Sequence, residues 1–418
     1  MHIEFLALLA CTLQVSTGGD PGGASDGMIV VIEPWASPAD VEDGKELMPI
    51  APSGVGAAGQ TLHLYGIAGD LTLEERTQML ADVQSTDGVV LAEWNLPASA
   101  PDTQRCDQGP SANFLGCTQA FYDGAPSEES YSTQPLLHEI GATFAHRELG
   151  NMTVIVAVID TGVDLAHPAL GRRFAAEGYD FLLERGQAWE VANGRDDDLD
   201  GFVDEAHGHG THVSSTITLV NPNARILPLR VLDSDGNGSA YNVARAIHYA
   251  VNSRATVINL SLGLSSDSAA VAEALAHARA LGVQVVAAAG NTAAQGVLFP
   301  ARHVSVLAVA SVGFDERISP YSTFGGAVSL SAPGAGIYGA MPDGNYAWWS
   351  GSSMASAVVA GSLSLTHSMC ETFMFSTPAE EVLMGNCRPI DVFNSGHVGL
   401  LGVGRVDLRR TAQEIRQN

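Results

Sequence analysis

Three short segments of the sequence each place one side chain that could do chemistry among small residues, beside an apolar run. In chain order these side chains are Asp160, His209 and Ser353. A serine hydroxyl is a poor nucleophile at neutral pH until a hydrogen-bonded base takes its proton, and a carboxylate can fix the orientation of that base. The three residues therefore predict acyl transfer through a triad, with Ser353 as the nucleophile, His209 as the base and Asp160 as the orienting carboxylate.

Apolar runs and helical patterns alternate along the part of the chain that carries these residues. Five runs without period-two alternation, typical of strands buried on both faces, cover residues 154–159, 225–232, 256–262, 283–289 and 305–312. Helices are predicted at residues 209–219, 240–253, 267–281 and 353–369. This alternation predicts an α/β fold with a doubly wound, mostly parallel sheet and helices on both faces. Sites in such sheets lie at the carboxyl ends of strands, and Asp160, Ser261 and Asn291 all lie where a predicted strand ends.

Length and composition indicate the broad class of protein. The 418 residues are 46% hydrophobic, which is enough for a globular interior, and the length favours a main domain with accessory segments. There are 46 acidic and 20 basic residues, which gives a net charge of -26. This excess argues against nucleic acid or an anionic membrane surface as a partner, and we expect a soluble monomer.

Residues 1–27 are predicted to be a leader followed by a flexible tether. An apolar core at residues 5–10 precedes Cys11, and the sequence LLAC that ends there resembles a bacterial lipoprotein box, in which the cysteine is lipidated. The alternative is an ordinary or mis-started signal peptide, although no lysine or arginine precedes the apolar core, as one does in a typical secretory signal. Both alternatives predict export, either into the medium or to the cell envelope with a membrane tether through Cys11. No run reaches the ~18 apolar residues that a membrane-spanning helix needs.

The rest of the chain divides by composition into three parts. Residues 28–97 are predicted to form a small α+β unit, with strands at 28–32, 62–65 and 89–94 and a helix at 72–83. Thr72 and Glu75 form a capping box at the start of that helix. Residues 98–133 are polar and irregular and are predicted to be a linker. Residues 134–418 carry the strand and helix alternation and form the larger domain.

Four of the five cysteines lie outside the leader, and this even number fits an exported protein. None has the spacing of a metal site, so zinc is not expected. Four cysteines allow three pairings, of which we predict the sequence-local one, Cys106 with Cys117 and Cys370 with Cys387. A disulfide that closes a loop of this size contributes roughly 3 kcal/mol. The alternative is four free, buried thiols.

The three segments VIDTG, HGTHV and GSSMAS, at residues 158–162, 209–213 and 351–356, resemble those of the subtilisin-like serine proteases. Further similar segments are VINLSLG (257–263), AAAGN (287–291), FPA (299–301), APG (332–334) and GVGRVD (402–407). The resemblance covers roughly residues 134–412. It implies a subtilisin-like fold and an exported endopeptidase that acts on proteins or peptides and processes itself from a proenzyme. It also implies that His209, and not His212, is the base.

The resemblance implies further roles for particular residues. Asn291 and the backbone N–H of Ser353 would stabilise the oxyanion. Peptide substrates would add as strands against two edges, one formed by Ser261, Leu262 and Gly263 and the other by Gly236, Asn237 and Gly238. The alternative for residues 236–238 is a plain turn. Residues 28–97 resemble the family's propeptide, which would act as an intramolecular inhibitor and folding chaperone.

Departures from the family pattern follow two of the triad residues. Ser214 and Ser215 replace the usual Ala-Gly after the base, Ser352 replaces the more common Thr, and Ala357 and Val358 replace the usual Pro-His. None of these changes removes a catalytic group, so we expect them to alter the packing behind the triad.

An acidic stretch lies just before His209. Aspartates at alternate positions followed by glycine match the start of a calcium loop, where oxygens converge on a hard cation. The predicted ligands are Asp196, Asp198, Asp200 and Asp204. The alternative is a solvated acidic loop without a metal, because the bidentate glutamate of an EF-hand is missing.

Two other functions fit the sequence less well than the endopeptidase. A catalytically silent binding lipoprotein on a protease fold usually arises by loss of a triad residue, and none is lost here. A carboxyl protease of the related Ser-Glu-Asp type does not fit, because a base histidine is present and Asn291 is not acidic.

Overall fold

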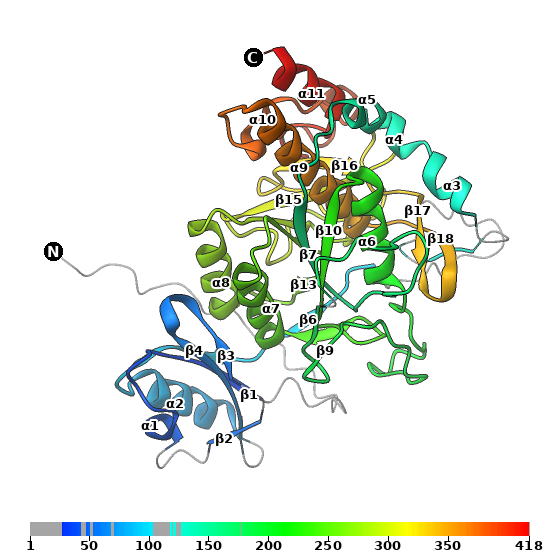
Figure 1. Cartoon of the computed structure of the whole chain (residues 1–418). Coiled ribbons are helices and arrows are strands. Elements are labelled where there is room, and N and C mark those ends of the chain that lie inside the picture. Colours follow the sequence, from blue (N-terminus) through cyan, green and yellow to red (C-terminus); the bar gives the residue numbers. More distant parts are fainter. Residues whose placement is uncertain are drawn as a thin grey trace.

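The computed structural model describes residues 27–42, 47–50, 53–67, 71–102, 118, 120–122, 127–176 and 178–417. A small amino-terminal unit lies against a larger one (Figure 1). The strands of the central sheet in the larger unit are β7 (Val154–Asp160), β8 (Tyr179–Asp180), β9 (Arg185–Gly186), β10 (Ala224–Arg230), β12 (Val257–Leu260), β14 (Gln284–Ala288), β15 (Val306–Val312) and β16 (Leu330–Pro333). Their order across the sheet is β16-β15-β14-β12-β7-β10-β8-β9. All neighbours pair in parallel except β8 and β9.

Helices cover both faces of this sheet. On one face lie α7 (Ala240–Asn252) and α8 (Ala269–Ala280), and on the other lie α6 (His209–Val220), α9 (Ser352–Phe373), α10 (Ala379–Gly385) and α11 (Leu408–Gln417). Strand β7 sends Ala157 and Ile159 into the first apolar cluster and Val156 and Val158 into the second. Alternate side chains of one strand are therefore buried on opposite faces, which explains why its sequence shows no polar alternation. The predicted doubly wound α/β fold is confirmed.

Shorter elements complete the larger unit. They are β6 (Pro97–Ser99), α3 (Glu128–Thr133), α4 (Leu136–Glu139), α5 (Ala142–Ala145), β11 (Asn237–Ser239), β13 (Gly263–Leu264), β17 (Ile337–Met341) and β18 (Asn345–Trp349), with 3-10 turns at His146–Glu148, Pro342–Gly344 and Asp391–Phe393. Helix α3 and two of the three residues of β6 lie within residues 98–133, which were predicted to be an irregular linker.

The amino-terminal unit has an antiparallel sheet with a helical layer. Its elements are β1 (Gly27–Ile32), α1 (Pro38–Glu42), β2 (Leu47–Pro49), β3 (Gly54–Val55), a 3-10 turn (Ala57–Gly59), β4 (Thr61–Ile67), α2 (Leu73–Gln84) and β5 (Val89–Trp94). The sheet order is β2-β4-β1-β5, and β3 pairs with β4. The capping box is present, because the hydroxyl of Thr72 accepts from the N–H of Glu75 and the Glu75 carboxylate accepts from the N–H of Thr72.

The sheet of the amino-terminal unit packs on helices α7 and α8. Its side chains Ile29, Val31, Leu62 and Leu64 belong to the same apolar cluster as those two helices. The carboxylate of Glu93 accepts from the backbone N–H groups of Ala269 and Ala270 at the start of α8, at 2.7 and 3.0 Å. The side-chain oxygen of Asn95 accepts from the N–H of Tyr241 in α7 at 3.0 Å. The amino-terminal unit thus packs its apolar face on α7 and α8. Glu93 and Asn95 also accept hydrogen bonds from the backbone N–H groups at the starts of these two helices, which have no partner within the helix.

One predicted disulfide is wrong. Cys370 and Cys387 are both free and buried. Cys387 follows α10 and its thiol donates to the carbonyl of Leu383 at 3.5 Å. Burial raises the pKa of Cys370 to about 11 and that of Cys387 to about 12. Both thiols act as small apolar groups where α9, α10 and α11 pack together, which is a common role for cysteine.

Some of the sequence predictions concern residues outside the described part of the chain. These residues are the leader with Cys11 and the pair Cys106 and Cys117. Among the described residues, no helix has both the length and the hydropathy that crossing a membrane requires.

Candidate active site

Asp160 and His209 meet at the carboxyl end of the central sheet. Asp160 is the last residue of β7 and His209 is the first of α6. The Oδ1 atom of Asp160 lies 2.7 Å from Nδ1 of His209 and also accepts from the N–H of Thr161 at 2.7 Å. Both side chains are buried. This contact fixes the ring orientation of His209 and is compatible with the predicted pair of orienting carboxylate and base.

Small residues let these two segments approach each other. Gly210, in the first turn of α6, lies against the carbonyl of Gly162, and a Cβ at Gly210 would overlap that oxygen. Gly208 before the helix has a φ of 99°, a left-handed conformation that favours glycine. Gly210 is therefore required by the close approach of the two backbone segments, and Gly208 by its left-handed conformation.

Ser353 lies in the first turn of α9 and is fully buried. Its hydroxyl donates to the carbonyl of Ser261 at 3.3 Å. Asn291 is next to it, because its Oδ1 atom accepts from the N–H of Ser352 at 2.9 Å. Ser261 follows β12 and Asn291 follows β14, so the start of α9 is joined to the ends of two neighbouring strands.

The carboxylate of Asp102, a residue of the predicted linker, faces the second ring nitrogen of His209. The Oδ2 atom of Asp102 lies 3.1 Å from Nε2 of His209. Burial by itself lowers the pKa of His209, but Asp160 and Asp102 outweigh this effect by charge and hydrogen bonding and raise the pKa to about 10. Between two carboxylates the ring is stable as the imidazolium, with both N–H groups donating. In the described part of the chain, Ser353 makes no hydrogen bond to His209.

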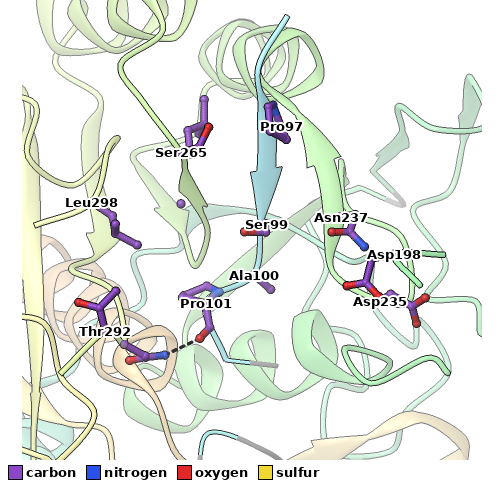
Figure 2. A pocket seen from close by; sticks show the side chains of 13 residues that line it. Pro97, Ser99, Ala100, Pro101, Asp198, Asp235, Asn237, Ser265, Thr292 and Leu298 are labelled. Atoms are coloured by element: carbon purple, nitrogen blue, oxygen red, sulfur yellow. Dashed lines mark hydrogen bonds between the residues drawn. The ribbon is translucent and has the colours of Figure 1, made fainter. Parts of the chain in front are cut away.

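The residues before Asp102 fill a groove as a strand. Strand β6 lies between β11 and β13 and pairs antiparallel with both (Figure 2). Ser99 lies opposite Asn237 on one side and Gly263 on the other. The N–H of Ala100 donates to the carbonyl of Gly236 at 2.9 Å. A pocket of about 380 Å³ is lined by this strand and by residues on both sides of it.

The two predicted substrate edges therefore flank one extended segment of the same chain. Asn237 and Gly238 lie in β11, Gly236 directly precedes it, and Gly263 opens β13. Leu262 is buried in the apolar core, and Ser261 contacts Ser353 behind the groove.

The strand leads to the predicted oxyanion donor. Nδ2 of Asn291 donates to the carbonyl oxygen of Pro101 at 3.0 Å (dashed line in Figure 2) and also to Oδ1 of Asp102. An amide N–H directed at a peptide carbonyl is the geometry that stabilises an oxyanion formed at that carbonyl. Asn291 thus holds the carbonyl of Pro101, His209 faces the side chain of the next residue, Asp102, and Ser353 lies near Asn291.

His212 has a different environment from His209. Its Nε2–H donates to the carbonyl of Ile337 at 3.1 Å, and burial lowers its pKa to about 3. The ring is neutral and packs edge-on against Trp349, with ring centroids 5.7 Å apart. It has a structural role behind the site.

Two overlapping acidic clusters lie on the β11 side of the groove. In each cluster the carboxylate oxygens lie within 4.8 Å of one another, and the clusters are Asp196, Asp198 and Asp235, and Asp198, Asp200 and Glu205. The predicted ligand Asp204 belongs to neither, because its carboxylate accepts from the N–H groups of Asn193 and Gly194 at 2.8 and 2.9 Å. Asp235 and Glu205 thus join Asp196, Asp198 and Asp200 in these clusters, whereas Asp204 lies outside them.

Sequence reasoning also missed Glu190. Its carboxylate accepts from the hydroxyls of Thr161 and Thr211 and from the N–H of Gly208 at 2.8 Å. It therefore joins the segment after Asp160 to the start of the helix that carries His209. No motif surrounds Glu190, so the sequence offered no signal for this role.

Comparison with known proteins gives a consistent result. Residues 151–384 match the family described as Subtilase family (Peptidase_S8). "Thermophilic serine proteinase" of Bacillus sp. (strain AK1) is 38% identical over 216 residues, which are 49% of this chain and 50% of the relative. "Thermitase" of Thermoactinomyces vulgaris is 36% identical over 216 residues, 49% of this chain and 72% of the relative. "Subtilisin BL" of Lederbergia lenta is 34% identical over 239 residues, 55% of this chain and 82% of the relative. The chain thus spans about half the length of the first of these relatives.

Proposed function

The chain belongs to the subtilase family, and from this premise we propose that it is a serine endopeptidase that hydrolyses peptide bonds through an Asp160–His209–Ser353 triad. One observation carries the proposal. A peptide strand lies in the groove beside the Asp160–His209 pair, with its carbonyl oxygen on the Asn291 amide. The name of one relative, "Thermophilic serine proteinase", supports the same activity.

The proposed reaction follows from these positions. His209 takes the proton of Ser353 as Oγ attacks the substrate carbonyl, and Asp160 holds the imidazolium that forms. Asn291 and the N–H of Ser353 stabilise the oxyanion, and the helix dipole at the start of α9 favours negative charge there. His209 then gives its proton to the leaving amine, and water hydrolyses the acyl-enzyme by the same steps in reverse. Strand pairing along β11 and β13 provides affinity with little demand on side chains.

We expect the processed chain to release soluble peptides from an unfolded protein substrate such as denatured casein. Strand addition requires an extended segment, so the same protein in its native fold should be cleaved far more slowly. Release of acid-soluble peptides over time measures both rates, and heat-denatured enzyme is the control. A folded, processed chain that hydrolyses neither form would contradict the proposal and favour a binding protein.

We also propose that residues 28–97 are an intramolecular inhibitor and that the chain processes itself. Three observations support this role: the apolar packing on α7 and α8, the contacts of Glu93 and Asn95 with the starts of these helices, and strand β6 in the groove. A unit whose carboxyl end fills the substrate groove excludes other peptides until it leaves.

Calcium is the proposed structural ion, and the acidic clusters fit it. Oδ1 of Asp235 and Oε2 of Glu205 are buried and have no hydrogen-bond partner among the described residues. Burial and the charges of Asp235 and Asp198 raise the pKa of Glu205 to about 8. Unpartnered oxygens and crowded carboxylates are what a hard cation would satisfy. The ion would hold the loop before His209 to the segment that leads into β11, through ligands from Asp196, Asp198, Asp200, Glu205 and Asp235.

Removal of calcium should lower thermal stability more than initial activity at room temperature. An ion that binds only the native state stabilises it by about 2.7 kcal/mol at a hundredfold excess over the dissociation constant. The melting temperature of the processed chain, measured with calcium and with chelator, tests this expectation.

The variant Asp198→Asn provides the matched comparison, because Asp198 belongs to both clusters. Its melting temperature should respond little to calcium, whereas Asp315→Asn, on a distant exposed turn, should keep the full response. Equal melting temperatures of the unmodified chain with and without calcium would rule out the site.

Export is a further proposal, and it rests on residues 1–27. The apolar core and the LLAC sequence support a leader, and lipidation of Cys11 would tether the enzyme to the cell envelope.

A further inference from the structure

Asp102, at the end of the segment in the groove, has its carboxylate among the catalytic side chains. Asp102 is fully buried. One carboxylate oxygen faces Nε2 of His209 at 3.1 Å, and the other accepts from Nδ2 of Asn291. The backbone carbonyl of Asp102 accepts from Nε1 of Trp349 at 3.3 Å. Gly351 leaves the space for this carboxylate, since a Cβ there would overlap it.

The peptide bond just before Asp102 has its carbonyl oxygen on the predicted oxyanion donor. The carbonyl oxygen of Pro101 lies 3.0 Å from the donor nitrogen of Asn291. The strand register upstream holds this position, because Ala100 donates to Gly236 and Ser99 lies opposite Gly263. The carbonyl of Asp102 is directed instead at Trp349, so the Pro101–Asp102 bond is the one whose oxygen meets the oxyanion donor.

The Asp102 carboxylate also opposes cleavage of that bond. It occupies the nitrogen of His209 that must take the serine proton, and it stabilises the protonated ring, which cannot act as a base. It competes with the Pro101 carbonyl for the amide of Asn291, and its charge would repel an oxyanion formed there. The Ser353 hydroxyl donates meanwhile to the Ser261 carbonyl and not to His209.

We propose that this site cleaves its own chain between Pro101 and Asp102, and that the Asp102 carboxylate delays the cleavage. The proposal rests on the endopeptidase function proposed above. Once Asp102 leaves Nε2 and the imidazolium loses its Nε2 proton to solvent, the neutral His209 ring takes the Ser353 proton as Oγ bonds to the Pro101 carbonyl carbon. The bond from that carbon to the Asp102 nitrogen then breaks, and the nitrogen takes the proton from His209. Water hydrolyses the resulting ester, which leaves a carboxylate at Pro101, an amine at Asp102 and a free Ser353 hydroxyl.

The test is the self-cleavage of freshly refolded full-length chain. Intact-mass and amino-terminal analysis should find a product that begins at Asp102, formed at a first-order rate that does not depend on protein concentration. Asp102→Asn keeps the shape of the side chain and removes its charge. A charge this close to a titrating group typically changes its ionisation equilibrium by about tenfold or more. We therefore expect Asp102→Asn to cleave about tenfold faster at neutral pH, with the substituted residue at the new amino terminus.

Asp87→Asn is the matched control, since Asp87 is exposed in the same unit and should leave the rate unchanged. A product that begins elsewhere would overturn the assigned bond, and an equal or slower rate for Asp102→Asn would overturn the delaying role. Hydrolysis of denatured casein by the same preparations tests the endopeptidase function separately. A preparation that hydrolyses no casein would contradict the endopeptidase function itself. A chain that digests casein but cleaves itself at another bond contradicts only the inference drawn here.

Discussion

Replacement of Ser353 by alanine should give a folded chain that stays at full length and hydrolyses no peptide bond at a useful rate. Self-cleavage and substrate cleavage use the same hydroxyl, so both should be lost together. Loss of the nucleophile of such a triad lowers turnover by about 10⁶-fold, a magnitude measured on subtilisin itself. Among the described residues the hydroxyl makes one hydrogen bond, to the Ser261 carbonyl, so the fold should survive its loss.

The measurement is the chain length of purified Ser353→Ala after prolonged incubation, together with its rate on denatured casein. Ser362→Ala is the matched control, because Ser362 is buried in the same helix and donates to the carbonyl of Val358 one turn earlier. That variant should process itself normally. If pure Ser353→Ala reached the mature size without a helper protease, self-processing by this site would be excluded.

Asn291→Ala is the second variant with a large expected effect. Turnover should fall by about two to three orders of magnitude, or ~2.7–4 kcal/mol, while the half-saturating substrate concentration stays similar. These magnitudes were also measured on subtilisin. The Asn291 amide donates to the carbonyl at the reaction position, and it acts mainly when that oxygen becomes an anion.

Steady-state kinetics on a peptide substrate separate the two parameters. Asn223→Ala is the comparison, because Asn223 lies at the opposite end of the parallel strands, just before β10, and donates to the carbonyl of Gly150. It should leave turnover unchanged. Turnover that survived Asn291→Ala would mean that another group supplies the second donor.

The fold of the larger unit was predictable because its signals are local. The runs at 154–159, 225–232 and 305–312 became β7, β10 and β15 with small changes at their ends. Buried parallel strands are continuously apolar, and the helices between them end near the predicted residues. The triad segments were also visible, since each lies at the end of a strand or the start of a helix.

Strand β6 was not predictable, because the two strands with which it pairs are far away in the sequence. Its three residues are Pro97, Ala98 and Ser99, and their composition resembles a loop. They form a strand only because β11 and β13, more than a hundred residues later, leave two edges that need partners. Asp102 was missed for the same reason, because its role comes from His209 and Asn291.

The members of the acidic clusters were also only partly predictable, because they come from separate parts of the sequence. The predicted ligands were taken from one run of the sequence, residues 196–204. Asp235 belongs to the cluster but lies in the segment after β10. The carboxylate of Asp204 instead accepts hydrogen bonds from two backbone N–H groups. The free thiols of Cys370 and Cys387 likewise follow from helix packing, which the spacing of two cysteines does not determine.

The central claim is that Ser353 is a nucleophile activated by His209 and Asp160. Reaction of the processed chain with a fluorophosphonate probe tests it most directly, because only an activated serine is labelled. We predict one label per chain, located on Ser353 by peptide mass analysis, and no labelling of His209→Ala. A folded, processed chain that takes up no label, or takes it up at another residue, would contradict the account.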